Sequence, residues 1–199
     1  MMLSAGHCVP NTVNALWGSC KPWVTDCTAS LGWNSSVLPA GWTSNMYYGG
    51  SGGDSAALEV HSAFAGNWVA YSSWWHWGNN AKVNIWGSTS PVLGETICQG
   101  GATTGISCGT VEELSWSFNQ PAAPGGIYGP TYIEGMIRAE GMCSQSGDSG
   151  GPVTIWHGGL AYGIVNSVGC GAPDFPYFRV SIEPITRALN GSGLQLYGG

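Results

Sequence analysis

Short apolar runs, separated by turns rich in glycine, recur along most of this chain. A run of four to eight apolar and β-branched residues between turn residues is typical of a β-strand. The run 108–117 alternates apolar and polar residues in part, although Glu112 and Glu113 break the period. The strands that we predict are 1–5, 54–60, 92–97, 108–117, 132–137, 153–156 and 160–165, with the last two forming a hairpin around 158–159.

One stretch near the end of the chain has a different period. Residues 182–189 place apolar side chains at helical spacing, and Asn190 and Gly191 follow as residues that end helices. Glycine supplies 33 of the 199 residues, which suits many short strands joined by tight turns. We therefore predict an all-β fold with one short C-terminal helix.

The charge of the chain and the length of its apolar runs argue against two classes of partner. Only 5 residues are Lys or Arg and the net charge is −6, so no basic patch can follow a phosphate backbone. No apolar run approaches the roughly 18 residues that a membrane-spanning helix needs. We expect neither a nucleic acid nor a membrane as partner.

The chain has 7 cysteines, a number typical of a protein from an oxidising compartment. Metal sites need ligand spacings such as C-x-x-C, which do not occur, and His61 and His76 lack Cys, Asp or Glu at such spacing. We expect no metal ion and no other cofactor. Cys20 and Cys27 are close enough in sequence to close a local loop.

The stretch 147–152, Gly-Asp-Ser-Gly-Gly-Pro, places one hydroxyl between glycines. Gly147 and Gly150 can adopt backbone angles barred to other residues, so a sharp turn can expose Ser149. The N–H groups of Gly147 and Ser149 can then point into one small space, as an oxyanion hole requires. A plain Gly-Ser turn would show the same six residues.

A second motif, Leu-Ser-Ala-Gly-His-Cys at 3–8, argues against a plain Gly-Ser turn at 147–152. Together with 147–152 it resembles the chymotrypsin-like serine proteases, and most of all the bacterial streptogrisin and alpha-lytic protease branch. The stretch 97–110 is similar to that branch's disulfide hairpin around a Thr-Thr-Gly turn. The stretches 135–138 and 182–189 are also similar to it, so the resemblance covers nearly the whole chain.

The resemblance implies two six-stranded antiparallel β-barrels with the active site between them. Residues 1–90 would form a partial first barrel with a Trp-rich connection, and residues 91–199 the second barrel with the C-terminal helix. It implies a secreted, monomeric serine endopeptidase that acts on a protein or peptide and needs no cofactor.

The resemblance also implies a catalytic triad of His7, Asp54 and Ser149, in the chain order of this class. Ser149 would attack the peptide carbonyl, His7 would move the proton and Asp54 would orient His7. Gly147 and Ser149 would supply the oxyanion-hole N–H groups.

Two other aspartates compete with Asp54. Asp26 lies beside a cysteine in a loop and Asp174 follows the nucleophile, whereas Asp54 begins a strand of small residues after a glycine-rich turn. The pattern G-x-S-x-G also occurs in α/β-hydrolases, but that reading needs an acid and then a histidine after the serine. Here His157 precedes Asp174, so we set this alternative aside.

Asp148 is a carboxylate inside a tight turn and needs a partner. In the streptogrisin branch a buried arginine supplies it, and Arg138 stands at the matching place. We therefore predict a buried Arg138–Asp148 pair, with a surface arginine as the alternative.

The cysteine pairs implied by the resemblance are Cys98–Cys108 and Cys143–Cys170. Cys8 is left over, because the family pairs this cysteine with one upstream. The sequence also passes from Met1 almost directly into the His motif, without a signal peptide or pro-region. We expect a fragment whose first barrel lacks its opening strands, with a compact variant as the alternative.

The walls of the specificity pocket are expected at 141–146 and 164–168. They contain no Asp or Glu, so cleavage after Lys or Arg is not expected. Asn166 stands where the family has a serine that contacts the catalytic aspartate, and Val168 would narrow the pocket and favour a small or apolar P1 residue. The substrate-binding residues that we predict are Ser144, Gln145, Asn166, Ser167 and Val168.

Aromatic residues crowd the stretch 61–90. They can form an exposed platform for a carbohydrate or a peptide, or a buried cover over the barrels, which we favour because large aromatic side chains are usually buried. Two other functions remain as alternatives: an inactive fragment of a protease, and a binding module that uses residues 64–90.

Overall fold

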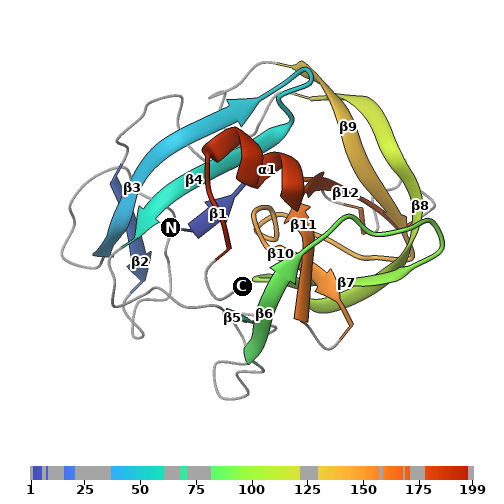
Figure 1. The fold of residues 1–199 in the computed structure, drawn as a ribbon, viewed down its shortest axis with the longest axis horizontal. Helices are drawn as coiled ribbons and strands as arrows, with labels where there is room; N and C mark the ends of the chain where they lie inside the picture. The colour runs from blue at the N-terminus through green and yellow to red at the C-terminus, as the bar shows by residue number, and fades with distance from the viewer. Residues whose placement is uncertain are drawn as a thin grey trace.

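The structure is a computed structural model, and it describes residues 2–5, 8, 16–20, 37–60, 68–70, 82–121, 130–156, 159–167, 169–170 and 178–196. The described elements are strands and one short C-terminal helix, so the predicted all-β class is confirmed. Figure 1 shows the strands in two groups, with the helix between them. Within these residues, no helix is long and apolar enough to cross a membrane.

The first group is a four-stranded sheet in the order β1-β4-β3-β2. Its longest pairing joins β3 and β4 through the turn at 49–53, where Gly49, Gly50 and Gly53 have positive φ angles. The strands are β1 (Met2–Ser4), β2 (Leu16–Cys20), β3 (Val37–Tyr48) and β4 (Asp54–Val60). The predicted strand 54–60 is confirmed with the same bounds.

The second group is an eight-stranded sheet in the order β10-β7-β8-β9-β12-β11-β6-β5, and a pairing between β10 and β11 closes six of its strands into a barrel. Strand β6 adds to this ring by pairing in parallel with β11. The strands are β5 (Trp68–Ala70), β6 (Lys82–Ser88), β7 (Thr96–Gly101), β8 (Gly105–Gln120), β9 (Thr131–Glu140), β10 (Pro152–Ile155), β11 (Gly159–Val165) and β12 (Arg179–Pro184). The predicted hairpin around 158–159 is confirmed. The domain boundary at residue 90 stays a prediction.

The interior of the barrel is apolar, as a closed sheet requires. Its buried residues are Ile97, Val111, Ile137, Ala139, Met142, Val153, Tyr162, Val165, Val180 and Ile182. Helix α1 (Ile185–Ser192) packs a second cluster, in which Ile185 and Leu189 meet Ile85 of β6 and Leu3 of β1. The helix therefore lies between the two sheets, as Figure 1 shows.

Two predicted elements differ from the structure. Residues 92–95 belong to a turn and β7 begins at Thr96, so the predicted strand 92–97 is wrong over most of its length. The helix predicted at 182–189 is wrong in its first part, because β12 runs to Pro184 and α1 begins at Ile185. Short apolar runs fit both periods, and four consecutive buried residues of β12 show that this strand is covered on both faces.

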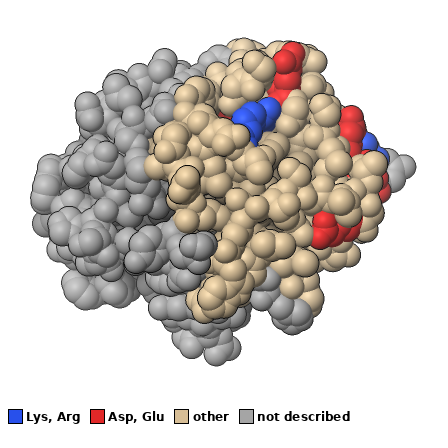
Figure 2. Space-filling model, in the orientation of Figure 1, with Lys and Arg blue, Asp and Glu red and all other residues tan. Residues whose placement is uncertain are grey.

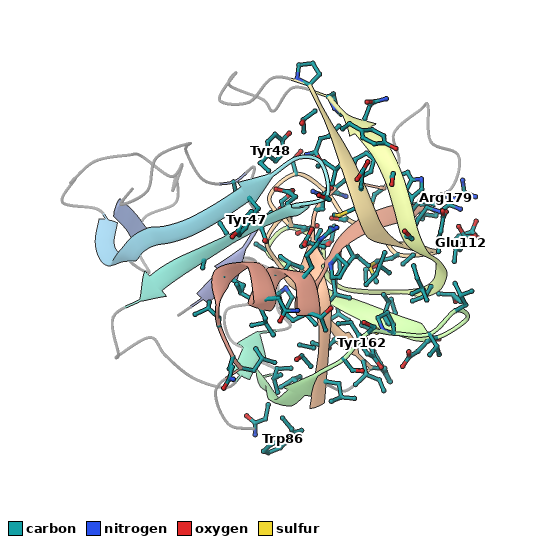
Figure 3. The ribbon with its side chains drawn as sticks, turned by 45° about the horizontal axis from the view of Figure 1, so that its top comes forward. Tyr47, Tyr48, Trp86, Glu112, Tyr162 and Arg179 are labelled. Atoms are coloured by element: carbon teal, nitrogen blue, oxygen red, sulfur yellow. A yellow bond between two sulfur atoms is a disulfide. The ribbon has the colours of Figure 1, made fainter. Side chains whose placement is uncertain are left out.

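The Trp-rich stretch lies largely outside the described residues. Trp86 of β6 is described, and its side chain is 62% exposed. Figure 3 shows it at the edge of the molecule, pointing away from the barrel. For this residue the predicted buried cover is wrong.

Candidate active site

Residues 147–151 form a tight turn between β9 and β10. Gly147 and Gly150 have φ angles of 99° and 84°, the left-handed region that favours glycine. The turn is closed by hydrogen bonds from Asp148 N to Gln145 O (3.0 Å) and from Gly151 N to Asp148 O (2.9 Å). Within the described residues, the N–H groups of Gly147 and Ser149 donate to no protein acceptor. The positive φ angles of Gly147 and Gly150 match the sharp turn that the sequence predicts, while the oxyanion hole stays a prediction.

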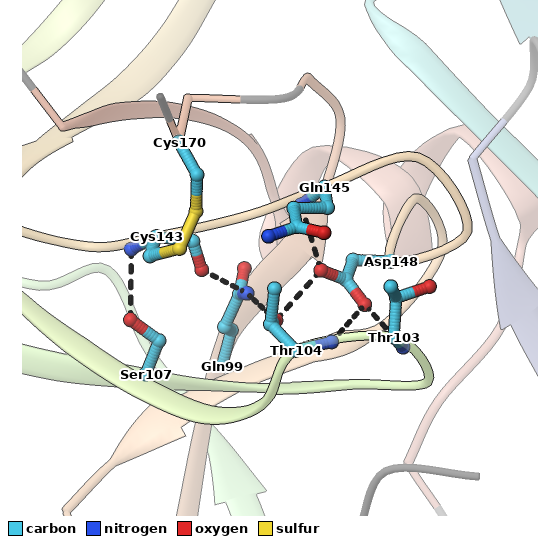
Figure 4. The surroundings of a disulfide bond; sticks show 8 residues. All are labelled: Gln99, Thr103, Thr104, Ser107, Cys143, Gln145, Asp148 and Cys170. Carbon is cyan, nitrogen blue, oxygen red and sulfur yellow. Dashed lines mark hydrogen bonds between the residues drawn. A yellow bond between two sulfur atoms is a disulfide. The ribbon is translucent and has the colours of Figure 1, made fainter. Parts of the chain in front are cut away.

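The carboxylate of Asp148 is buried and accepts four hydrogen bonds, all from neutral donors. Oδ1 accepts the backbone N–H groups of Thr103 (2.7 Å) and Thr104 (3.1 Å). Oδ2 accepts the Thr104 hydroxyl (2.7 Å) and the Gln145 N–H (2.8 Å), as Figure 4 shows. A carboxylate with this many donors is fully paired without a cation.

The predicted Arg138–Asp148 pair is wrong. Arg138 forms ion pairs with Glu112 (3.2 Å) and Glu113 (3.4 Å) of the neighbouring strand β8, and its guanidinium lies over the ring of Trp116. The period of β9 explains this, because Ile137 and Ala139 face the barrel core and side chains alternate along a strand. The alternative of a surface arginine is the one that the structure bears out.

Two of the three residues that hold Asp148, Thr103 and Thr104, come from the tip of the β7–β8 hairpin, and sequence reasoning did not identify them. Gln99 is fully buried, and its side-chain amide donates to Thr104 Oγ1 (3.1 Å) and to the backbone oxygen of Cys143. The Thr103 hydroxyl donates to Ser146 O at 2.8 Å. The Thr-Thr-Gly turn was visible in the sequence, but nothing there connects it with Asp148.

Two disulfide bonds frame the same region. Cys98–Cys108 joins β7 to β8 at the base of the hairpin, and Cys143–Cys170 anchors the segment that leads into the turn. Both pairings predicted from the family resemblance are confirmed.

Asn166 connects Ser149 with Asp54. The Ser149 hydroxyl donates to the backbone oxygen of Asn166 at 3.1 Å. The Asn166 side-chain amide donates to Asp54 Oδ2, and the Ser181 hydroxyl donates to Asn166 Oδ1 at 3.1 Å. Asn166 stands where the family is expected to have a serine. Its side-chain amide therefore donates to Asp54 in place of a serine hydroxyl.

Asp54 is completely buried at the first position of β4, where the two sheets meet. Its backbone N–H donates to Glu183 Oε2 of β12 at 2.8 Å. Burial raises the pKa of the Glu183 carboxyl, while hydrogen bonds from Arg187 act in the opposite direction. The competing residues Asp26 and Asp174 lie outside the described residues.

The other predicted substrate-binding residues differ in burial and in their hydrogen bonds. Ser144 is buried, and its backbone oxygen accepts the N–H groups of Gly169 (2.9 Å) and Cys170 (3.2 Å), which directly follow the expected wall 164–168. Ser167 is half-buried and accepts the Ser181 N–H at 3.3 Å, while Gln145 is exposed. Among the residues that the structure describes, no three His, Cys, Asp or Glu side chains gather to hold a metal ion.

Four predicted side chains lie outside the described part of the chain. His7, Val168 and Cys27 are not described, and Cys20 is described only as backbone of β2. The cysteine that follows His7 is described: Cys8 is a free thiol, as expected, and its Sγ contacts the backbone oxygen of Ser149 at 3.8 Å.

Comparison with known proteins gives a consistent result. The trypsin family model matches residues 1–189. Streptogrisin-C of Streptomyces griseus is 32% identical over 137 residues, which are 65% of this chain and 27% of that protein. Glutamyl endopeptidase 2 of Streptomyces griseus is 31% identical over 120 residues, 60% of this chain and 56% of that protein. The chain therefore matches only part of the length of these relatives.

Among solved structures, Thermobifida fusca protease A superimposes with a TM-score of 0.67 at 26% identity. The superposition covers 99% of this chain and 84% of that one. The arrangement of the two sheets is therefore that of the chymotrypsin-like fold, as the sequence predicts.

Proposed function

Because the chain belongs to the trypsin family of serine proteases, we propose that Ser149, His7 and Asp54 form the catalytic triad of a serine endopeptidase. Ser149 attacks the peptide carbonyl to form an acyl-enzyme, and His7 accepts the hydroxyl proton and passes it to the leaving amine. Asp54 orients His7 and stabilises the imidazolium. The observation that carries this proposal is the Asn166 bridge, which brings Ser149 and Asp54 to one residue.

The position of His7 in this proposal is supported by its neighbour. Cys8 contacts the Ser149 backbone, and consecutive Cα atoms in a chain are about 3.8 Å apart. Cys8, the residue that follows His7, therefore lies next to the nucleophile turn.

The oxyanion hole in this proposal uses the N–H groups of Gly147 and Ser149. Asp148 lies between these two donors in the sequence. The four hydrogen bonds to its carboxylate support the proposed oxyanion hole, because they hold the turn in place. Preorganised donors are effective because they need no rearrangement when charge develops on the substrate oxygen.

The proposed substrate is a protein or peptide with a small or apolar P1 residue. The expected walls, 141–146 and 164–168, contain neither an acid that would hold Lys or Arg nor a cation that would hold Glu. The proposed P1 preference therefore differs from the glutamyl preference that the name of glutamyl endopeptidase 2 gives for that relative. The two disulfides favour an extracellular site of action, and a monomer is the proposed state.

A fluorophosphonate probe tests the proposal on the purified chain. We expect the probe to label Ser149, as mapped by mass spectrometry, and His7→Ala to abolish labelling. Ser115→Ala, an exposed serine on β8, is the matched control and should be labelled like the wild type. Labelling at another serine, or unchanged labelling of the His7→Ala variant, would contradict the triad. Folded protein that is not labelled at all would favour the inactive alternative.

A further inference from the structure

A second carboxylate lies directly behind Asp54. Glu183 of β12 is 0% exposed, as is Asp54, and its Oε2 accepts the Asp54 backbone N–H at 2.8 Å. Two acidic residues are thus buried side by side at the point where the two sheets meet. A buried charge is costly unless it is paired and hydrogen-bonded, so this arrangement needs a specific partner.

Arg187 of α1 is that partner. Its Nε donates to Glu183 Oε1 and its Nη2 to Glu183 Oε2, both at 2.7 Å, which makes a bidentate pair. Its Nη1 donates to the backbone oxygen of Glu134 in β9 at 2.6 Å. One guanidinium therefore joins α1, β9 and β12 around the carboxylate that holds Asp54.

Glycines make room for this cluster. Gly53, with φ 75°, precedes Asp54, and a Cβ there would collide with Glu183 Oε2. Gly135, with φ 65°, lies on β9, and a Cβ there would come within 2.9 Å of Arg187 Nη1. The turn that carries Gly53 also docks on β9, through hydrogen bonds from Gly50 N to Tyr132 O (2.7 Å) and from Glu134 N to Gly50 O (3.1 Å).

We propose that Glu183 is a positioning residue for catalysis: with Arg187, it fixes the place of Asp54 relative to Asn166 and Ser149. Asp54 belongs to the first sheet, whereas Asn166 and Ser149 follow strands of the second. Two hydrogen bonds link Asp54 to the second sheet. Glu183 accepts one from the Asp54 backbone N–H, and Asn166 donates the other to the Asp54 carboxylate. The inference rests on the proposed role of Asp54 in the triad.

The experiment measures kcat and KM for Glu183→Leu and Glu183→Gln, each in the wild-type and in the Asp54→Asn background. A misplacement of about 1 Å can cost on the order of 10²-fold in rate, so we expect Glu183→Leu to lower kcat by about 10- to 100-fold with KM nearly unchanged. Glu183→Gln keeps an oxygen acceptor for the Asp54 N–H and should retain more activity. In the Asp54→Asn background the loss should shrink to about twofold or less, because residues that act through one another are not additive.

The outcomes separate this inference from the triad proposal. Equal losses in both backgrounds would show that Glu183 acts only on folding and would overturn the inference. Unchanged kcat in the Glu183 variants, with Asp54→Asn inactive, would overturn it while leaving the triad intact. Wild-type activity of Asp54→Asn would overturn both. If Glu183→Leu does not fold, Glu183→Gln carries the test, and Glu113→Gln, which removes one carboxylate of a surface ion pair, is the matched control.

Discussion

Two buried carboxylates near the site, Asp148 and Glu183, are stabilised in opposite ways. Asp148 accepts only neutral donors, which are three backbone N–H groups and one hydroxyl. Glu183 accepts one backbone N–H and the two-pronged hydrogen bonds of a single arginine. Both solve the same problem, since an ionised carboxylate cannot be buried without partners.

The difference lies in where the stabilisation comes from. Three of the four donors of Asp148 are backbone N–H groups, two at the tip of the disulfide-bonded β7–β8 hairpin and one at Gln145, so most of its stabilisation does not depend on a side chain. The Glu183 carboxylate, in contrast, receives two of its three hydrogen bonds from the side chain of Arg187. We therefore expect the Asp148 site to tolerate loss of a single side chain much better than the Glu183 site does. Figure 2 shows few charged side chains among the described residues on the face that Figure 1 views.

The largest expected effect is on stability in Arg187→Met. This change leaves the Glu183 charge buried without its cation, and breaking a buried pair costs about 3–5 kcal/mol. Urea denaturation followed by tryptophan fluorescence measures the loss. Arg187→Lys keeps the charge and should lose less, and an unfolding free energy equal to wild type in Arg187→Met would show that Glu183 does not depend on this cation.

The next effect is on activity in Asp148→Ala. Three backbone N–H groups lose their acceptor, and the turn that holds the proposed oxyanion donors is no longer fixed. Misplacing one such donor costs about 10²–10³ in kcat. Active-site titration with steady-state kinetics separates a lower kcat from a smaller folded fraction. Wild-type kcat in this variant would mean that the turn holds its shape without the carboxylate.

A smaller effect is expected for Thr104→Val. The Asp148 carboxylate loses one of four donors and the buried Gln99 amide loses one of two acceptors. Leaving such groups unpaired costs about 1–3 kcal/mol. Thermal unfolding should show the loss, and Thr104→Ser, which keeps the hydroxyl, should restore most of it. Equal stability of the two variants would contradict the role of this hydroxyl.

The smallest effect is expected for Arg138→Ala. Its partners Glu112 and Glu113 are partly exposed, and such ion pairs are worth about 0–1 kcal/mol. Chemical denaturation should show a loss within this range, and kcat should equal that of the wild type. If Arg138→Ala lost as much activity as Asp148→Ala, the result would support an Arg138–Asp148 pair. It would also contradict the contrast between Asp148 and Glu183.

The parts of the site that could be predicted are those in which a short stretch specifies its own backbone. The turn at 147–150 follows from two glycines around Ser149, and β4 follows from small residues after a glycine-rich turn. The disulfide pairs and the fold followed from paired motifs that resemble one family. The predicted partner of Asp148 is wrong. The family resemblance implies Arg138, but the Arg138 side chain points away from the barrel core and pairs with Glu112.

The sequence determined where reactive groups occur along the chain, because glycine angles and strand periods are local properties of a few residues. The tertiary structure decided which groups meet across long separations: Thr104 with Asp148, Asn166 with Asp54, and Glu183 with both Asp54 and Arg187. Hydrogen bonds across sheets depend on register and on which face each side chain takes. Those are set when the barrel closes around its whole core, and no single stretch contains that information.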